Sequence, residues 1–308
     1  MTIGVLTPAD RGIEGRYKRT KPMTDQNGQE ELANNFMALH DSSEILVLPN
    51  AWDVASAKIF ELEGFRAIGT TSAGIAATLG YSDGQQMSLF ENLDVVRRIV
   101  VGTDVPVSAD IESGYAASID GVAQCAEAVL DAGAVGLNLE DGSGDIDSPL
   151  FEQSLQAEKI TAMREMSISK GKQLFINART DVFLVGENST AALREAVERG
   201  NAYRAAGADC IFIPDVGNLD AQAIEILAQE IPAPINIIAG ETTPPIPALQ
   251  DMGVARVSVG PRPMRAVLSL LKKIARELRV SGTYELMMDS SLTYSEVNQW
   301  FTARGNRP

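Results

Sequence analysis

Residues 105–142 read VPVSADIESGYAASIDGVAQCAEAVLDAGAVGLNLEDG and contain one full copy of a repeating pattern. An apolar, β-branched run at 105–109 is followed by a segment of helical period at 122–132. A glycine joint then leads into a second apolar run at 135–139. A strand, a helix and a second strand in this order are typical of a βα unit in a parallel sheet.

The same pattern recurs along the chain. Four helical segments end in a similar glycine joint, at which a left-handed glycine can close a helix: EGF at 63–65, DAGA at 131–134, AAGA at 205–208 and DMGV at 251–254. We predict strands at the apolar runs Ile45–Pro49, Ala67–Thr70, Val105–Ala109, Val135–Leu139, Leu174–Ala178, Cys210–Ile213, Ile235–Ala239 and Ala255–Val259. Eight βα units favour a closed (β/α)8 TIM-type barrel. An open doubly wound sheet is the alternative, although no GxGxxG motif opens the first helix.

The pattern divides the chain into three parts. Residues 1–29 are polar and aperiodic, which predicts a flexible N-terminal arm. Residues 30–280 form the predicted barrel, and we expect it to be the catalytic domain because barrels of this type carry active sites at one end. Residues 281–308 carry a second apolar pattern, which predicts an extra C-terminal helical segment. Its apolar face can dock on a neighbouring subunit or pack back on its own barrel, and both arrangements stay open.

Charge and cysteine content exclude several classes of protein. The chain has 26 Lys+Arg and 41 Asp+Glu, for a formal net charge of −15, which argues against nucleic acid or an anionic membrane surface as a partner. The two cysteines, Cys125 and Cys210, cannot form a disulfide framework, and we expect both to be buried. We find neither a secretory signal nor an apolar stretch of membrane-spanning length, so we expect a cytoplasmic protein.

Acidic residues follow two neighbouring predicted strands. Asp110 and Glu112 come at the end of the third strand, and both would project from one face if the strand continued through them. Glu140 comes at the end of the fourth strand. Three carboxylates that converge repel one another unless a cation lies between them. Carboxylate oxygens and waters are ligands that suit Mg²⁺ and Mn²⁺, so we predict a divalent-metal site with Mg²⁺ as the expected cofactor.

Arg179 follows the fifth strand, beside these acids. Its guanidinium can grip a carboxylate or a phosphonate in a bidentate way. A metal and an arginine together stabilise the enolate that develops when a bond alpha to a keto acid breaks. Acids at strand ends can also be solvated or cap helices, and such an arginine can form a structural ion pair. The joint placement of these groups at one end of one sheet favours the functional interpretation.

Five stretches together resemble the isocitrate lyase/phosphoenolpyruvate mutase superfamily. They are LPNAWDVASAKIFELEGFRAIGTTSAG at 48–74, TLGYSDG at 78–84, VPVSADIESGY at 105–115, GAVGLNLEDG at 133–142 and INARTDVF at 176–183. The resemblance implies a (β/α)8 barrel that assembles as a homo-oligomer, a tetramer or dimer, with a helix exchanged between subunits. It also implies a Mg²⁺-dependent site for a small oxo-acid.

The resemblance also implies roles for single residues. Asp110 is implied to be the acid closest to the metal. The carboxylates implied to hold the waters of the metal are Glu112, Glu140 and Asp83. The segment implied to receive the substrate carboxylate is Thr71, Ser72 and Ala73. Arg179 is implied to contact the other end of the substrate.

The chain departs from the family after the fourth strand. Isocitrate and methylisocitrate lyases carry a Lys-Lys/Arg-Cys-Gly-His loop there, whereas residues 142–153 read GSGDIDSPLFEQ. Lyases that depend on that cysteine are therefore disfavoured. The single histidine, His40, lies on the predicted N-terminal helix, where we expect a surface or packing role. The candidates for a general base are Asp145, Asp147, Tyr115 and Ser143, and the predicted catalytic residues are Arg179, Glu112 and Tyr115.

Three functions are consistent with these residues. The leading hypothesis is a Mg²⁺-dependent lyase that cleaves a C–C bond in a small 2-oxo or 2-hydroxy dicarboxylic acid. The second is P–C bond chemistry, by a phosphonomutase or a phosphonopyruvate hydrolase, on the same metal site. The third is a non-catalytic barrel that binds oxo-acids, because the loop at 142–153 has no obvious acid/base residue of the family type.

Overall fold

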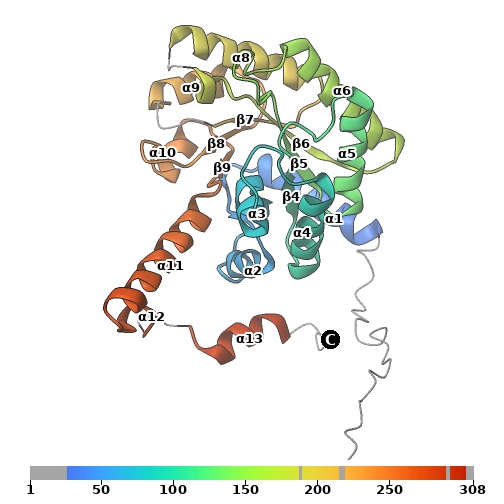
Figure 1. The fold of residues 1–308 in the computed structure, drawn as a ribbon. Helices are drawn as coiled ribbons and strands as arrows, with labels where there is room; N and C mark the ends of the chain where they lie inside the picture. The colour runs from blue at the N-terminus through green and yellow to red at the C-terminus, as the bar shows by residue number, and fades with distance from the viewer. Residues whose placement is uncertain (1–25, 187–188, 215–218, 289–291, 303–308) are drawn as a thin grey trace, which may run out of the picture.

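The computed structural model describes residues 26–186, 189–214, 219–288 and 292–302, and it folds as a barrel of parallel strands surrounded by helices (Figure 1). The strands follow one another in the order β1-β9-β8-β7-β6-β5-β4-β3-β2, and every neighbouring pair is parallel. Their bounds are β1 Leu46–Leu48, β2 Asn50–Ala51, β3 Ile68–Thr70, β4 Val107–Asp110, β5 Gly136–Glu140, β6 Phe175–Arg179, β7 Cys210–Ile213, β8 Ile235–Ile238 and β9 Arg256–Ser258. The predicted (β/α)8 barrel is therefore confirmed.

The first predicted strand, Ile45–Pro49, corresponds to β1, and the short strand β2 follows just beyond it, so eight predicted runs become nine strands. Leu46, in β1, is in register with Arg256 of β9, while Asn50, in β2, is in register with Gly69 of β3. Pro49 lies between the two pieces and has no N–H to donate to a ladder. The two pieces join the last strand to the second, and this connection closes the sheet.

Helices alternate with the strands on the outside of the barrel (Figure 1). Helical periodicity predicts seven segments, at 54–62, 93–101, 122–132, 156–169, 191–206, 221–228 and 263–279. All seven are present, and their bounds are α2 Val54–Leu62, α4 Leu89–Gly102, α5 Ile119–Asp131, α6 Gln153–Ser169, α8 Thr190–Ala205, α9 Ala221–Glu230 and α11 Arg262–Val280. Three helices were not predicted: α3 Ser72–Leu79, α7 Val182–Val185 and α10 Ile246–Asp251. These are short, so their apolar period is too brief to be read reliably.

Local sequence explains where most of these helices begin and end. Asp53 and Ser88 close capping boxes at the starts of α2 and α4, since each side chain accepts from a backbone N–H in the first turn. The glycine joints have the expected left-handed backbone, with φ of 87° at Gly64 and 110° at Gly207. The chain therefore turns toward the next strand at the predicted places.

The N-terminal helix α1, Gln26–His40, closes the barrel at the end where the strands begin. Phe36 is fully buried there and lies edge-on to Phe175, the first residue of β6. Gly136 leaves room for this ring, because a Cβ at that position would lie 3.0 Å from Phe36. The helix starts before the predicted barrel boundary at residue 30, and residues 1–25 of the predicted arm lie outside the described residues.

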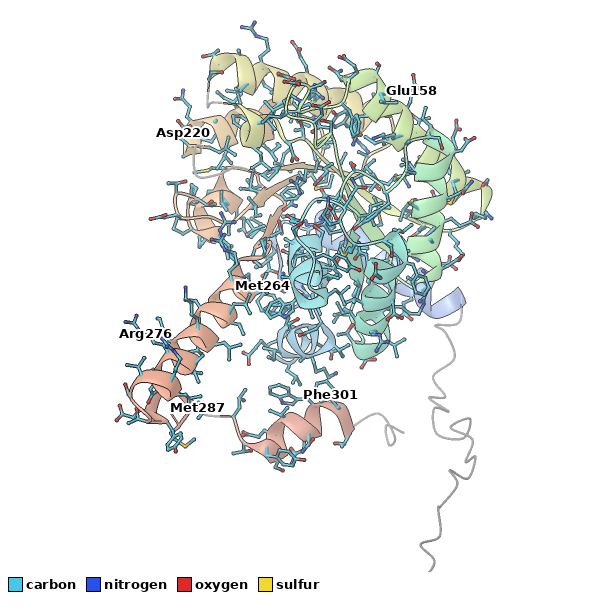
Figure 2. All side chains as sticks on the ribbon, viewed as in Figure 1. Glu158, Asp220, Met264, Arg276, Met287 and Phe301 are labelled. Carbon is cyan, nitrogen blue, oxygen red and sulfur yellow. The ribbon has the colours of Figure 1, made fainter. Side chains whose placement is uncertain are left out.

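The C-terminal part leaves the barrel (Figure 1). Helix α11 projects away from the strands, and α12 Glu285–Met288 and α13 Tyr294–Thr302 follow it. Neither α12 nor α13 has a buried residue, and side chains along α11 stand clear of the barrel (Figure 2). The two helices lie within the range 281–308 for which a helical segment was expected. No helix in the described ranges is both long and apolar enough to cross a membrane.

Candidate active site

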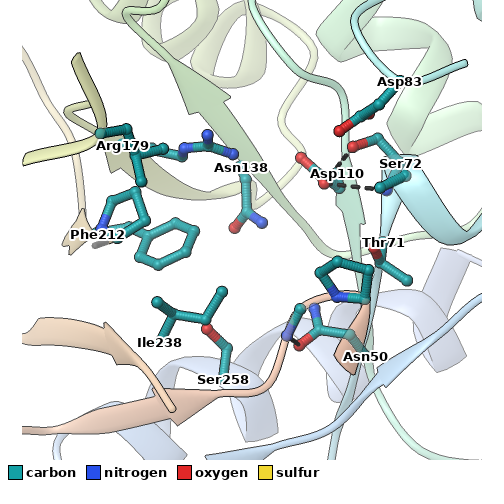
Figure 3. Close-up of a pocket in the computed structure, with 15 residues that line it drawn as sticks. Asn50, Thr71, Ser72, Asp83, Asp110, Asn138, Arg179, Phe212, Ile238 and Ser258 are labelled. Atoms are coloured by element: carbon teal, nitrogen blue, oxygen red, sulfur yellow. Dashed lines mark hydrogen bonds between the residues drawn. The ribbon is translucent and has the colours of Figure 1, made fainter. Parts of the chain in front are cut away.

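A cavity of about 160 Å³ lies at the end of the barrel where the strands finish (Figure 3). This is the end at which barrels of this type place their functional groups. Its lining comes from most of the strands: Asn50, Thr71, Ser72, Ala73, Asp83, Asp110, Asn138, Arg179, Leu184, Phe212, Pro214, Ile238, Ser258, Gly260 and Pro261. Six of the predicted site residues, Asp110, Asp83, Arg179, Thr71, Ser72 and Ala73, are in this lining.

Asp110 is the last residue of β4 and is oriented by its neighbours from β3 and α3. Its backbone N–H donates to the Thr70 hydroxyl at 2.9 Å. Its Oδ2 accepts from the backbone N–H of Ser72 at 3.0 Å and from the Ser72 hydroxyl at 2.8 Å. Its Oδ1 is buried and has no hydrogen-bond partner among the described residues. Asp110 therefore presents one fixed, unpaired carboxylate oxygen to the cavity (Figure 3).

Asp83 approaches Asp110 from the loop after α3 (Figure 3). Burial raises the pKa of Asp83, and the charge of Asp110 raises it further. A second carboxylate that lines the same cavity as Asp110 increases the negative potential there. This arrangement favours a cation, which would relieve the repulsion between the two acids.

Glu112 does not continue strand β4, so the expected alternation of Asp110 and Glu112 on one face is wrong. The strand ends at Asp110, and Glu112 has a left-handed backbone with φ of 50°. Its Oε2 accepts from the backbone N–H of Gln85 at 2.6 Å, and its Oε1 accepts from the Tyr115 hydroxyl at 2.8 Å. Glu112 thus holds the loop of Gln85 beside the cavity rather than lining it.

Tyr115, a predicted catalytic residue, also lies behind the lining. Its hydroxyl donates to Glu112, and its backbone N–H donates to the Gln85 side chain at 2.8 Å. Burial raises the pKa of the Tyr115 hydroxyl, and the charge of Glu112 adds to this. The hydroxyl therefore keeps its proton near neutral pH and can orient Glu112, but it is poorly suited to act as a base.

Arg179, at the end of β6, is shared by two carboxylates. Its Nη1 lies 2.7 Å from Glu140 Oε2, while Nε and Nη2 donate to the two oxygens of Asp181 at 2.5 and 3.0 Å. The edge that would grip a substrate carboxylate in a bidentate way is therefore taken by Asp181. A substrate anion would have to share this guanidinium with both acids. The sequence analysis did not assign a role to Asp181, which stands two residues after Arg179.

Glu140 lies outside the lining, although it ion-pairs with Arg179, which is within it. Burial raises the pKa of Glu140, Arg179 opposes this effect, and the charges of Asp181 and Asp110 reinforce it. The acids around Arg179 thus form one coupled cluster with an excess of negative charge. The guanidinium itself stays protonated, because two carboxylates raise its pKa against the effect of burial.

Thr71, Ser72 and Ala73 lie at the start of α3, which begins at the cavity. Thr71 caps the helix, since its hydroxyl accepts from the Gly74 N–H at 3.4 Å. The backbone N–H and hydroxyl of Ser72 already donate to Asp110. The predicted carboxylate-binding segment therefore also serves to position the predicted metal ligand.

Three candidates for the general base lie in the loop after β5, away from the lining. Ser143 donates to the carbonyl of Ser148 within the loop. Ser143 also accepts from the backbone N–H of Asp145, and Asp145 accepts from that of Asp147. Asp145 and Asp147 are exposed. The structure gives these side chains local turn contacts and does not bring them to the cavity.

Three lining residues that the sequence analysis missed are Asn138, Phe212 and Ser258. They lie on β5, β7 and β9, and Asn138 is in register with Asp110 of β4. The sequence pattern that could have identified them is the alternation along each strand, because residues two apart face the same side of a sheet. These residues lie within the strands and not beyond their ends, where the acids and the arginine were predicted.

The donor set of the cavity fits a Mg²⁺ ion that keeps part of its water shell. Within the described part of the chain, no three His, Cys, Asp or Glu side chains lie close enough to hold one ion directly. Mg²⁺ usually binds through one or two carboxylates and several waters. The unpaired Oδ1 of Asp110 and the nearby carboxylate of Asp83 meet that requirement.

A family model and several relatives match most of the chain. The family model described as phosphoenolpyruvate phosphomutase matches residues 36–279. An uncharacterised protein of Mycobacterium tuberculosis is 34% identical over 247 residues, which is 79% of this chain and 88% of that protein. A 2-methylisocitrate lyase of Halalkalibacterium halodurans is 27% identical over 279 residues, covering 87% of this chain and 89% of the lyase.

Solved structures agree with the sequence matches. A crystal structure from Burkholderia cenocepacia is 32% identical, with a TM-score of 0.84 over 90% of this chain and 98% of the other. A 2,3-dimethylmalate lyase structure has a TM-score of 0.77 at 22% identity, covers 87% and 94% of the two chains, and supports the fold. Lyases among the relatives confirm the expected class of enzyme. The chain belongs to the phosphoenolpyruvate phosphomutase family, in agreement with the superfamily that its motifs resemble.

Proposed function

We propose that this protein is a Mg²⁺-dependent lyase that cleaves a C–C bond in a small 2-oxo or 2-hydroxy dicarboxylic acid. The observation that carries the proposal is the unpaired, buried Oδ1 of Asp110, in a cavity that also contains Asp83 and Arg179. The cavity is suited in size to a small acid. Relatives that are named 2-methylisocitrate lyase and 2,3-dimethylmalate lyase support this type of substrate.

Each group has a role in this proposal. Asp110 would hold the cation directly, and Asp83 would hold its waters, with Glu112 and Glu140 contributing from behind the lining. The cation supplies positive charge beside the oxygens on which negative charge develops as the C–C bond breaks. Arg179 orients the substrate by its remaining N–H groups, while Asp181 and Glu140 keep the guanidinium in place. The start of α3 at Thr71–Ala73 would receive a substrate carboxylate.

Proton transfer has few carriers in this cavity. Of the described residues that line it, the ionisable ones are Asp83, Asp110 and Arg179. Cys125 and Cys210 are buried as expected, on α5 and β7, and neither lines the cavity. We therefore propose that cleavage proceeds without a cysteine acid. Asp83 is the carboxylate of the lining that would not hold the cation directly, which makes it the best-placed proton carrier.

We also propose that the protein is a homo-oligomer, as the superfamily resemblance implies. Met264 of α11 is buried against the barrel, and the same helix face continues outward through Val267, Leu268 and Leu271, which are exposed in a single chain. Such a continuous apolar stripe is typical of a protein–protein interface. A second copy of the chain is the occupant that best fits this surface.

One assay tests the proposed reaction. The protein is incubated with oxaloacetate, 2-methylisocitrate, 2,3-dimethylmalate and phosphonopyruvate in turn, with Mg²⁺ or with EDTA, and products are followed by NMR. We expect cleavage of at least one C–C substrate, lost in EDTA and restored by Mg²⁺. Turnover of phosphonopyruvate alone would favour P–C chemistry. Binding without turnover of any compound would favour the non-catalytic alternative.

A further inference from the structure

A second arginine lies deeper in the barrel than Arg179, below the floor of the cavity. Arg256 is on β9 and is completely buried. Its Nη2 lies 3.4 Å from Asn138 Oδ1, while Nε and Nη1 have no hydrogen-bond partner among the described residues. No Asp or Glu in the described ranges forms an ion pair with it. A buried charge without a partner is expensive to maintain, so a role in folding does not explain it.

The neighbours of Arg256 do not neutralise its charge. Burial keeps the pKa of Cys210 at about 12 and lowers that of His40 to about 3, so both side chains are neutral near pH 7. Burial also lowers the pKa of Arg256, but only to about 10, which leaves it protonated. The anionic group whose charge reaches it is Asp110, which lines the cavity. The charge of Arg256 is therefore not neutralised by its neighbours, and it interacts with a carboxylate of the cavity lining.

Arg256 also decides how Asn138 faces the cavity. Asn138 Oδ1 accepts from Asn177 Nδ2 at 2.8 Å and faces Arg256 Nη2. A guanidinium can only donate, so turning the amide over would place one donor against another. Asn138 Nδ2 must then point away from Arg256, toward the cavity that this residue lines between Arg179 and Asp110 (Figure 3).

The floor therefore presents donors. Ser258 stands two residues after Arg256 on β9, lines the cavity, and has a buried hydroxyl with no partner among the described residues. Asn138 Nδ2 and this hydroxyl can both donate to an oxygen atom. The positive charge beneath them strengthens such bonds to an anion.

We infer that Arg256 is a positioning residue that turns the cavity floor, formed by Asn138 and Ser258, into a binding surface for an oxygen of a small carboxylate or oxo-acid anion. This inference deepens the proposed function and rests on it for the identity of the site. The floor selects a ligand with an acceptor oxygen at this point and rejects one with an ammonium or another donor there. Arg179, which two carboxylates already occupy, is then not the main anion-binding group.

Oxalate is a suitable probe because its binding can be measured without turnover. Its Kd is determined by calorimetry at saturating Mn²⁺, and the Kd of Mn²⁺ alone is determined by electron paramagnetic resonance. Asn138→Asp keeps the oxygen that accepts from Asn177 and Arg256 but replaces the cavity-facing N–H with an anionic oxygen. Arg256→Met removes the charge, and Arg256→Lys retains it. Arg164→Met is the matched control, since Arg164 pairs with Asp209 near the opposite end of the barrel.

We expect Asn138→Asp and Arg256→Met to weaken oxalate binding by about tenfold or more, without weakening Mn²⁺ binding. Arg256→Lys should recover most of the affinity, and Arg164→Met should lower the Tm while leaving both Kd values unchanged. A variant whose fold is generally destabilised would bind both oxalate and Mn²⁺ more weakly, so a loss of oxalate binding alone indicates a local effect on the floor. Oxalate binding within twofold of wild type in both variants, or no oxalate binding by the wild type, would overturn the inference. The protein could also bind oxalate in an Arg256-dependent way but cleave none of the four acids of the assay above. That result would contradict the proposed lyase function and leave the inference about Arg256 intact.

Discussion

The two carboxylate oxygens of Asp110 have different roles, one in the fold and one in the cavity. Oδ2 accepts two hydrogen bonds from Ser72, which fix the side chain. Oδ1 is buried without a partner in the described part of the chain, a state that is costly unless a ligand occupies it. A single residue therefore connects the end of β4, the start of α3 and the proposed metal.

Asp110→Ala tests this division at the residue scale. We expect the variant to lose metal-dependent oxalate binding, with a Kd at least ~100-fold higher, because the direct ligand of the cation is gone. Calorimetry with and without Mg²⁺ measures the change. Asp147→Ala removes an exposed carboxylate from the loop after β5 and should leave the Kd unchanged. Equal binding by Asp110→Ala and wild type would exclude Asp110 as the ligand.

At the scale of elements, helix α1 seals the barrel through an aromatic contact. His40 is buried at the end of α1 and stacks on Phe175 of β6, with ring centroids 4.0 Å apart. Its Nδ1 lies 2.8 Å from the carbonyl oxygen of Phe36, so Nδ1 carries the proton and donates. Its Nε2 is buried with no described partner. The expected packing role of His40 is therefore confirmed.

This contact makes stability depend on pH in a predictable direction. Burial lowers the pKa of His40 from 6.5 to about 3, with a further contribution from Arg256. Below pH 6.5 the unfolded chain binds a proton that the folded chain does not, so the free energy of unfolding falls as the pH falls. We expect a contribution of about 2 kcal/mol between pH 7 and pH 5.

Urea unfolding of wild type and His40→Phe at several pH values measures this contribution. His40 is the only histidine in the chain, and the carboxylates with raised pKa are the same in both proteins. The difference between the free energies of unfolding of the two proteins should therefore change with pH only because of the protonation of His40. Parallel pH curves for the two proteins would show that His40 does not resist protonation.

At the scale of the whole molecule, the barrel is complete, but the described residues leave most of α11 exposed. Leu268 and Leu271 are 49% and 56% exposed on a helix that projects from the barrel (Figure 1). Few monomers leave such a stripe in water. The described residues thus leave an apolar surface on α11 exposed, which supports the proposed assembly with a second copy of the chain.

Leu271→Glu should convert the proposed oligomer to smaller species, because it places a charge in the apolar stripe without touching the barrel. Sedimentation velocity measures the mass of the particle. Lys272→Glu is the matched control, since it puts the same residue at the neighbouring exposed position of α11, and it should leave the mass unchanged. A wild-type protein that sediments as a monomer would refute the assembly.

Repetition in the sequence was enough to predict the barrel and the end of it that carries the candidate site. Strand runs, helical period and glycine joints are local features, because each depends on residues a few positions apart. The site residues that follow directly on strands, such as Asp110 and Arg179, could be found in the same way. Glu112 could be found but not placed, since its left-handed backbone interrupts the strand pattern.

The sequence by itself determined a βα repeat, a parallel barrel, and acids and an arginine at one end of it. Only the tertiary structure decided which oxygens and N–H groups stay free. Asp181 occupies Arg179, Ser72 occupies one oxygen of Asp110, and Arg256 turns Asn138 across a separation of 118 residues. The pairings of Ser72 with Asp110 and of Arg256 with Asn138 follow from the order and closure of the sheet, which bring separate strands together in the barrel. The pairing of Asp181 with Arg179 depends on how the chain turns directly after β6. Local periodicity carries no information about them, because a strand pattern shows which side chains face inward but not which ones they meet.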